Sequence, residues 1–253
     1  MPTPHHDDIK RKVRETYGKV ATAGTSGCGC SCSTSRGYSQ AELDSVPKGA
    51  DMGLGSGNPL AVADIQPGET VLDLGSGGGV DCFLAADAVG DDGLVIGIDM
   101  TPEMVNRARA KAKEGGYSNV VFRLGEIENL PVADSSVDVI MSNCVINLSP
   151  DKTAVYREAF RVLKPGGRLA ISDVVTTAEL PDAARGDLER YAACVSGAAS
   201  TNELKDTLSE AGFEAIRIQP KSGGRDIPGT WEPGSDIGDY TVSATVEALK
   251  PVD

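Results

Sequence analysis

The feature that most constrains the fold is the segment Val71–Gly79, which reads Val-Leu-Asp-Leu-Gly-Ser-Gly-Gly-Gly. A short strand ends at Leu74, and the glycines after it allow the backbone to turn tightly into a helix. Further apolar runs follow along the chain with helical segments between them, an alternation that is typical of an α/β domain with a parallel sheet. The predicted strands are Thr70–Leu74, Leu94–Asp99, Val120–Leu124, Val137–Ser142 and Arg168–Val174.

Capping signals predict where helices begin and end. Thr101-Pro102 supplies an N-cap followed by a proline at the first helical position, and Gly115-Gly116 ends that helix. By the same signals, Ser149-Pro150 opens a helix that Pro165-Gly166-Gly167 closes. Further helices are predicted at Ile9–Tyr17, Asp182–Val195 and Asn202–Ala211.

The last part of the chain offers two more strands. One is predicted near Phe213–Ile218, and the alternation of apolar residues from Tyr240 to Val246 suits an edge strand. We expect a Rossmann-like sheet, mostly parallel with a last antiparallel strand, flanked by helices. Because ligands bind beyond the carboxyl ends of such strands, the residues that follow the first, second and fourth strands are the candidate site.

The composition excludes several functions. The 253 residues carry 24 Lys+Arg and 37 Asp+Glu, a net charge of −13, without the clustered basic residues of a nucleic-acid-binding protein. No apolar run approaches the roughly 20 residues that cross a bilayer, and Met1–Asp8 lacks the apolar core of a signal peptide. We therefore expect a cytoplasmic protein without nucleic-acid or membrane partners.

Changes in composition and periodicity along the sequence divide the chain into three parts. Residues 1–60 combine a short charged helix with a Gly/Ser/Cys stretch that has no core-forming periodicity, so we expect a flexible N-terminal arm. Residues 61–180 hold the glycine loop and the strand–helix alternation of a cofactor-binding domain. Residues 181–253 form a C-terminal part with a helix and the closing strands.

The glycine loop favours a cofactor without phosphate groups. The dinucleotide fingerprint requires a third glycine where this chain has Val80, and no Gly-Lys-Ser/Thr phosphate loop is present. Asp73 ends the first strand, and Asp99 ends the second, where a carboxylate can accept both hydroxyls of a ribose. This combination resembles motif I and its acidic partner in class I S-adenosylmethionine methyltransferases, whose cofactor has a ribose and a sulfonium.

That resemblance implies a set of cofactor contacts. Gly75, Ser76 and Gly77 would face the methionine part, Asp99 would hold the ribose, and Met100 would pack on the adenine. The full set implied by the resemblance is Asp73, Gly75, Ser76, Gly77, Asp99, Met100, Gly125, Glu126, Ile127 and Asn143.

The presence of six cysteines indicates a function for their thiols, because a cytoplasmic chain does not normally keep structural disulfides. They are Cys28, Cys30, Cys32, Cys82, Cys144 and Cys194. Cys144 ends the fourth strand, where a transferred methyl group should arrive, whereas Cys82 is equally well explained as a small buried residue. The spacing suits structural zinc poorly, and soft thiolates favour a thiophilic centre.

The chain from Val71 to about Ala199 resembles the arsenite S-adenosylmethionine methyltransferases. The segments that carry the resemblance are Cys82-Phe83, Asp99–Met104, Arg123–Glu128, Ser142–Lys152 and Cys194–Ala198. Tyr17–Val20 and Ala248–Pro251 resemble the N-terminal segment and the final strand of that family. The block Ser-Asn-Cys-Val-Ile-Asn-Leu at 142–148 is the most distinctive.

The family pattern implies a mechanism. Cys144 and Cys194 would hold trivalent arsenic, supplied as arsenite or methylarsenite, and its lone pair would attack the methyl group of S-adenosylmethionine. The other cysteines, with Cys32 and Cys82 as candidates, would supply electrons by forming a disulfide. A thiol reductant, either thioredoxin or a small thiol, would then reset them.

One departure from the family pattern concerns Ser56. Relatives carry a third catalytic cysteine in a Gly-Cys-Gly block, where this chain has Gly55-Ser56-Gly57. We expect either that Cys32 compensates or that the range of substrates is narrower. Two other functions remain open: methylation of a small organic acceptor such as a quinone or sterol precursor, and binding of a metalloid without turnover.

Overall fold

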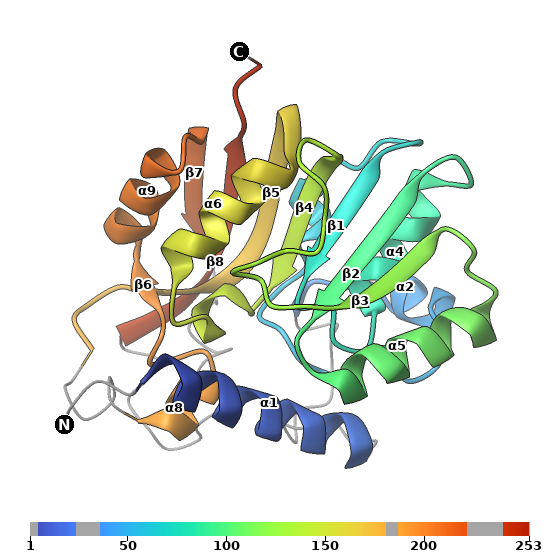
Figure 1. Cartoon of the computed structure of the whole chain (residues 1–253), viewed down its shortest axis with the longest axis horizontal. Coiled ribbons are helices and arrows are strands. Elements are labelled where there is room, and N and C mark those ends of the chain that lie inside the picture. The colour runs from blue at the N-terminus through green and yellow to red at the C-terminus, as the bar shows by residue number, and fades with distance from the viewer. Residues whose placement is uncertain (1–4, 24–35, 181–186, 222–239, 253) are drawn as a thin grey trace.

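The fold is built around one sheet with helices on both of its faces (Figure 1). This computed structural model describes residues 5–23, 36–180, 187–221 and 240–252. The strand order is β3-β2-β1-β4-β5-β8-β7, and the short β6 pairs with β5. The strands are β1 Thr70–Leu74, β2 Leu94–Asp99, β3 Val120–Leu124, β4 Val137–Asn143, β5 Leu163–Thr176, β6 Ala199–Ser200, β7 Glu214–Pro220 and β8 Thr241–Leu249.

The predicted α/β alternation is confirmed. The strands β1, β2 and β3 have the predicted bounds, β4 ends one residue later than predicted, and β5 is longer at both ends. The strands β1, β2, β4 and β5 pair in parallel and are buried on both faces, as their nearly continuous apolar residues require.

Two hydrophobic clusters hold the helices against the sheet. On one face, α3, α4 and α5 pack around residues such as Phe83 and Val105, and on the other face α6 and α9 pack around residues such as Tyr156 and Leu208. The helices are α1 His6–Ala23, α2 Gln40–Ser45, α3 Leu60–Ala63, α4 Val80–Val89, α5 Pro102–Gly115, α6 Lys152–Val162, α8 Leu188–Ala192 and α9 Thr201–Glu210, with a 3-10 helix η2 at Ile146–Leu148. None of these helices is long and apolar enough to span a membrane.

The expectation that the last strand lies at the sheet edge was wrong. β8 runs antiparallel to both of its neighbours and lies between β5 and β7, so that β7 forms the edge. The residues between its alternating apolar side chains are small, including Thr241 and Ser243, and both of these are fully buried. β8 can therefore be covered on both faces, as an interior strand must be.

The predicted boundaries of α6 also need correction. The helix begins at Lys152, because Asp151 provides the N-cap by accepting a hydrogen bond from the Ala154 N–H at 2.9 Å. It ends at Val162, and Pro165-Gly166-Gly167 lies inside β5. An aspartate that reaches a backbone N–H is a good N-cap, and here it acts instead of the earlier serine.

The described parts of residues 1–60 pack on the sheet domain, in contrast to the expected flexible arm. In α1, the side chains of Ile9 and Val13 are buried in a cluster that includes Cys144 and Leu148. α1 thereby crosses the carboxyl ends of the strands next to α8 (Figure 1). The three cysteines at 28, 30 and 32, and residues 182–186 of the predicted helix Asp182–Val195, lie outside the described residues.

Candidate active site

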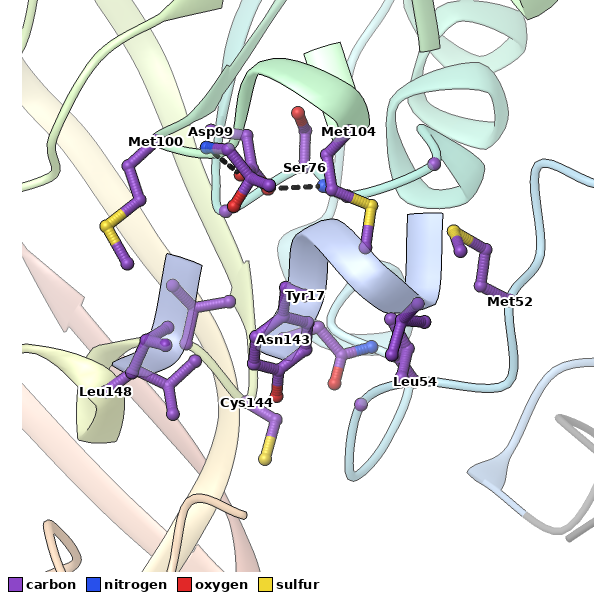
Figure 2. A pocket seen from close by; sticks show the side chains of 18 of the residues that line it. Tyr17, Met52, Leu54, Ser76, Asp99, Met100, Met104, Asn143, Cys144 and Leu148 are labelled. Atoms are coloured by element: carbon purple, nitrogen blue, oxygen red, sulfur yellow. Dashed lines mark hydrogen bonds between the residues drawn. The ribbon is translucent and has the colours of Figure 1, made fainter. Parts of the chain in front are cut away.

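A pocket of about 280 Å³ lies at the carboxyl ends of the parallel strands, beneath α1. Its wall is formed by the loop after β1, the end of β2, the end of β4, the segment 50–55 and the inner face of α1 (Figure 2). Side chains that Figure 2 labels around it are Tyr17, Met52, Leu54, Ser76, Asp99, Met100, Met104, Asn143, Cys144 and Leu148.

The loop after β1 supplies a close backbone approach. The N–H groups of Gly75 and Ser76 both donate to the carbonyl oxygen of Ile98, at 2.8 and 2.9 Å. Gly75 has φ +73°, and a Cβ atom there would overlap the side chain of Val145. Only glycine therefore allows this loop to lie directly against the residue that follows Cys144.

Asp99 lies at the end of β2 and is held in place by two backbone donors. Its Oδ2 accepts the Gly77 N–H at 3.0 Å, and its Oδ1 accepts the Thr101 N–H at 2.8 Å (Figure 2). Burial raises the pKa of Asp99, and these two hydrogen bonds oppose that shift. Each carboxylate oxygen keeps a second lone pair with which it can accept a hydroxyl.

The side chains of the pocket wall fit a nucleoside cofactor that lacks phosphates. The hydroxyl of Ser76 is buried at the pocket wall without a hydrogen-bond partner among the described residues, so it can bind a polar ligand atom. Lys10 is the one basic residue of this wall in the part of the chain that the structure describes, and its ammonium is neutralised by Glu126 at 2.7 Å and Glu128 at 3.4 Å. The remaining wall is rich in apolar side chains, which suit an adenine ring and a methyl sulfonium.

Cys144 and Cys194 come together in the same pocket. The thiol of Cys194 donates a hydrogen bond to the carbonyl oxygen of Cys144 at 2.9 Å, and both thiols are free. Both side chains are buried, at 5% and 3% exposure. Both residues have a left-handed backbone, with φ +58° and +62°, which is uncommon outside glycine and frequent at functional sites.

The surroundings keep the Cys144 thiol protonated in the resting protein. Burial raises the pKa of Cys144 well above its usual value, and the neighbouring Cys194 and Asp173 raise it further. The hydroxyl of Ser56 acts in the opposite direction and lowers it. A ligand that binds here must therefore displace the thiol proton.

Asn143 fixes the loop that carries Ser56 beside Cys144. Its Oδ1 accepts the Ser56 N–H at 2.9 Å, and its Nδ2 donates to the Gly57 carbonyl at 2.7 Å. The Ser56 carbonyl accepts from the Ser243 hydroxyl at 2.7 Å. The side chain of Ser56 is fully buried, and its Oγ makes no well-directed hydrogen bond within the described residues.

The same asparagine is hydrogen-bonded to a buried acidic group that also lines the pocket, Asp81. Asn143 Nδ2 also donates to the Tyr38 hydroxyl, which in turn donates to Asp81. Burial raises the pKa of Asp81 to about 6, and the hydrogen bonds from Tyr38 and Asn143 oppose that shift.

Most of the predicted site residues line this pocket. Those that do are Gly75, Ser76, Gly77, Asp99, Met100, Gly125, Ile127, Asn143, Cys144 and Cys194. Asp73 and Cys82 do not, because the thiol of Cys82 donates to Asp73 Oδ2 at 3.2 Å inside the core. The side chain of Glu126 pairs with Lys10 and Arg14 of α1. Cys32 lies outside the described residues.

Sequence reasoning missed the apolar part of the wall. Met52, Leu54 and Met104 line the pocket from two segments that lie far apart in the sequence. Met104 and Tyr17 stand in segments that carry the family resemblance. Met52 and Leu54 follow no pattern that predicts a contact with a ligand.

The fold and the site define a class: an S-adenosylmethionine-dependent methyltransferase whose pocket is lined by two thiols. The model of the methyltransferase domain matches residues 65–212. The arsenite methyltransferase of Halobacterium salinarum is 50% identical over 97% of this chain and 67% of its own length. That of Aquipseudomonas alcaligenes is 46% identical over 63% of this chain and 48% of its own length.

A solved structure agrees with these relatives. The arsenic(III) S-adenosylmethionine methyltransferase of Chlamydomonas reinhardtii matches with a TM-score of 0.65 at 30% identity, over 100% of this chain and 75% of that one. The chain belongs to the arsenite methyltransferase family. It spans about two thirds of the first of the two relatives and about half of the second.

Proposed function

We propose that this chain transfers the methyl group of S-adenosylmethionine to trivalent arsenic held by Cys144 and Cys194. The observation that carries the proposal is that two free, buried thiols line the same pocket as the glycine loop and Asp99. Trivalent arsenic is thiophilic, and soft thiolates bind such centres in preference to oxygen ligands. When bound, S-adenosylmethionine supplies an electrophilic methyl group on its sulfonium.

In this proposal the protein orients the cofactor and the arsenic atom and excludes water from the site. Asp99 accepts hydroxyls of the ribose, and Ser76 with the backbone of the glycine loop orients the methionine part. Cys144 and Cys194 hold arsenic so that its lone pair faces the methyl group, and the apolar wall excludes water. No general base is needed for the transfer itself, because the nucleophile is a lone pair.

The product of the transfer is pentavalent arsenic, and its return to the trivalent state consumes two electrons. Two thiols supply them by forming one disulfide and releasing two protons. Ser56 has no thiol, and the thiol of Cys82 is buried in the core, where it donates a hydrogen bond to Asp73. We therefore propose that the electrons come from the cysteines at 28, 30 and 32, or from an external thiol such as thioredoxin or a small thiol.

The proposed substrate and the proposed compartment both rest on the chemistry of the free thiols. We propose arsenite or methylarsenite as the acceptor, with the buried Ser56 narrowing the range of products. Free thiols persist in a reducing compartment, so we propose that the reaction takes place in the cytoplasm.

Arsenic speciation tests the proposed function. The protein is incubated with S-adenosylmethionine, arsenite and a thiol reductant, and the products are separated by chromatography with element detection, beside Cys144→Ser and Cys82→Ser variants. We expect methylated arsenic from the parent and from Cys82→Ser, and none from Cys144→Ser. Equal products from the parent and Cys144→Ser would contradict the proposal. Methylation of organic acceptors by both would favour the alternative acceptor class.

A further inference from the structure

Cys144 also contacts a polar cluster that is not part of the pocket wall. The N–H of Cys144 donates to the carbonyl oxygen of Ser172 at 2.8 Å, and the hydroxyl of Ser172 accepts from Lys221 Nζ at 2.8 Å. Ser56 completes this cluster, because its buried hydroxyl lies beside the Cys144 thiol. Ser56, Ser172 and Lys221 do not line the pocket that holds Cys144.

A glycine makes room for the lysine. A Cβ atom on Gly57 would overlap both Lys221 Nζ and the Ser172 hydroxyl. The Gly57 backbone is itself fixed, since its carbonyl accepts from Asn143 at 2.7 Å. The ammonium group therefore reaches the inside of the fold through a gap that no other residue type at 57 would leave.

Lys221 is anchored at the end of β7. Its N–H donates to the Ser243 carbonyl of β8 at 2.8 Å, and its side chain is half-buried. Among the described residues, no carboxylate lies within ion-pair distance of its ammonium. A half-buried cation without a carboxylate is free to interact with another anion.

The group that can become that anion is the Cys144 thiol. The charged and titratable groups that face Cys144 are Cys194, Asp173 and Lys221, with Lys152 acting on the first two. Burial lowers the pKa of Lys221, and the charge of Cys144 raises it. Burial, Cys194 and Asp173 disfavour the Cys144 thiolate and dominate at rest. The groups that favour it are the Ser56 hydroxyl and, through its charge, Lys221.

We propose that Lys221 is a positioning residue that stabilises the thiolate of Cys144 during arsenic binding. The inference rests on the proposed function. In the binding step an As–OH bond breaks and an As–S bond forms. The Cys144 proton leaves with the hydroxide as water, and no electrons are exchanged. The ammonium of Lys221 and the hydroxyl of Ser56 stabilise the negative charge on sulfur while the bond forms.

The pH dependence of alkylation at individual thiols tests this role without arsenic. The full chain is treated with iodoacetamide over a range of pH, and the modification of Cys144, Cys194 and Cys82 is followed by peptide mass spectrometry. The variants are Lys221→Met and Lys221→Gln, which remove the charge, and Lys221→Arg, which keeps it. Lys164→Met is the matched control, because Lys164 pairs with Asp138 at the opposite end of β5.

In both neutral variants we expect iodoacetamide to alkylate Cys144 about 10-fold more slowly at neutral pH. The midpoint of the pH profile of Cys144 should be higher, as loss of one nearby charge predicts. Lys221→Arg should restore most of the rate, and the Cys82 profile should not move. An unchanged Cys144 profile in Lys221→Met or Lys221→Gln would overturn the proposal. So would a Lys221→Arg variant that behaves like the neutral ones. Lys221→Gln keeps a hydrogen-bond donor for Ser172, so the test stands if Lys221→Met does not fold.

Arsenite binding, measured by equilibrium dialysis with element detection, separates this inference from the proposed function. We expect Lys221→Met to bind arsenite about 10-fold more weakly, in line with the thiolate lost at neutral pH. Cys144→Ser should bind it far more weakly than the parent does, because one of the two proposed sulfur ligands is lost. If Cys144→Ser binds like the parent, the proposed function fails, whatever alkylation shows. If only the Lys221 variants match the parent, the function stands and the role of Lys221 is contradicted.

Discussion

The thiol of Cys194 donates a hydrogen bond to the main-chain oxygen of Cys144 at 2.9 Å, although the two residues lie 50 positions apart in the sequence. Both residues have a left-handed backbone, which directs their side chains into one pocket. A left-handed conformation is costly for a residue with a Cβ atom, so the surrounding fold must hold it in place. That cost provides a direct test of the site geometry.

The first prediction compares glycine and alanine at position 194. We expect Cys194→Gly to be more stable than Cys194→Ala by about 1 kcal/mol in chemical denaturation, because only alanine is strained at φ +62°. Cys82 is the matched control, since it lies inside α4, where alanine should be the more stable by about 1 kcal/mol. The same order of stability at both positions would contradict the left-handed backbone at 194.

The second prediction separates Asp99 from Glu126, which the family resemblance placed together in the cofactor site. We expect Asp99→Asn to weaken S-adenosylmethionine binding about 10-fold or more, because a buried charged acceptor is lost. Glu126→Gln should stay within about twofold of the parent, since its side chain pairs with α1. Isothermal titration calorimetry measures both. Equal losses in the two variants would show that Glu126 also contacts the cofactor.

Much of this fold could be predicted from the sequence, because its signals are local. Short apolar runs bounded by glycine or aspartate gave β1, β2 and β3 with correct bounds. The position of β8 could not be predicted in this way, since alternation alone does not show that small residues such as Ser243 are buried on the other face. Similarly, the sequence predicted that Ser149-Pro150 opens α6, and only the geometry shows that Asp151 is its N-cap.

The candidate site was predictable where motifs carry it and not where distant segments meet. The glycine loop, Asp99, Cys144 and Cys194 follow from motifs and from the family resemblance. The contact of Asn143 with the Ser56 loop joins residues 87 positions apart, and the approach of Lys221 to Ser172 depends on a gap at Gly57. Such long-range contacts have no local signal in one sequence.

The third prediction concerns Ser56. We expect Ser56→Cys to form a disulfide with Cys144 under mild oxidation, because the position 56 side chain is buried beside that thiol. On the proposed function, the variant should also shift the products toward more highly methylated arsenic. Thiol counting and arsenic speciation measure the two effects, with Ser56→Ala as the control that adds no thiol. If Ser56→Cys keeps all its thiols free under oxidation, the two positions are not adjacent.

The fourth prediction concerns the pH dependence of stability. The pKa of Asp81 is raised to about 6 from a usual value of 3.8, so between these values the folded protein binds more protons than the unfolded chain. The free energy of unfolding therefore falls as pH rises through this window, by at most about 3 kcal/mol from this group. We expect Asp81→Asn to remove that decline, as seen in urea denaturation at pH 4 and pH 7. A variant with the same pH dependence as the parent would contradict the raised pKa.

X-ray absorption at the arsenic edge shows whether Cys144 and Cys194 hold arsenic, because it reports the atoms bound to arsenic. The protein is loaded with one equivalent of arsenite in the absence of cofactor and small thiols, beside Cys144→Ser and Cys82→Ser variants. We expect sulfur ligands from Cys144 and Cys194 in the parent and in Cys82→Ser, and loss of one sulfur ligand in Cys144→Ser. An arsenic atom with only oxygen ligands in the parent, or the same sulfur coordination in Cys144→Ser as in the parent, would contradict this expectation.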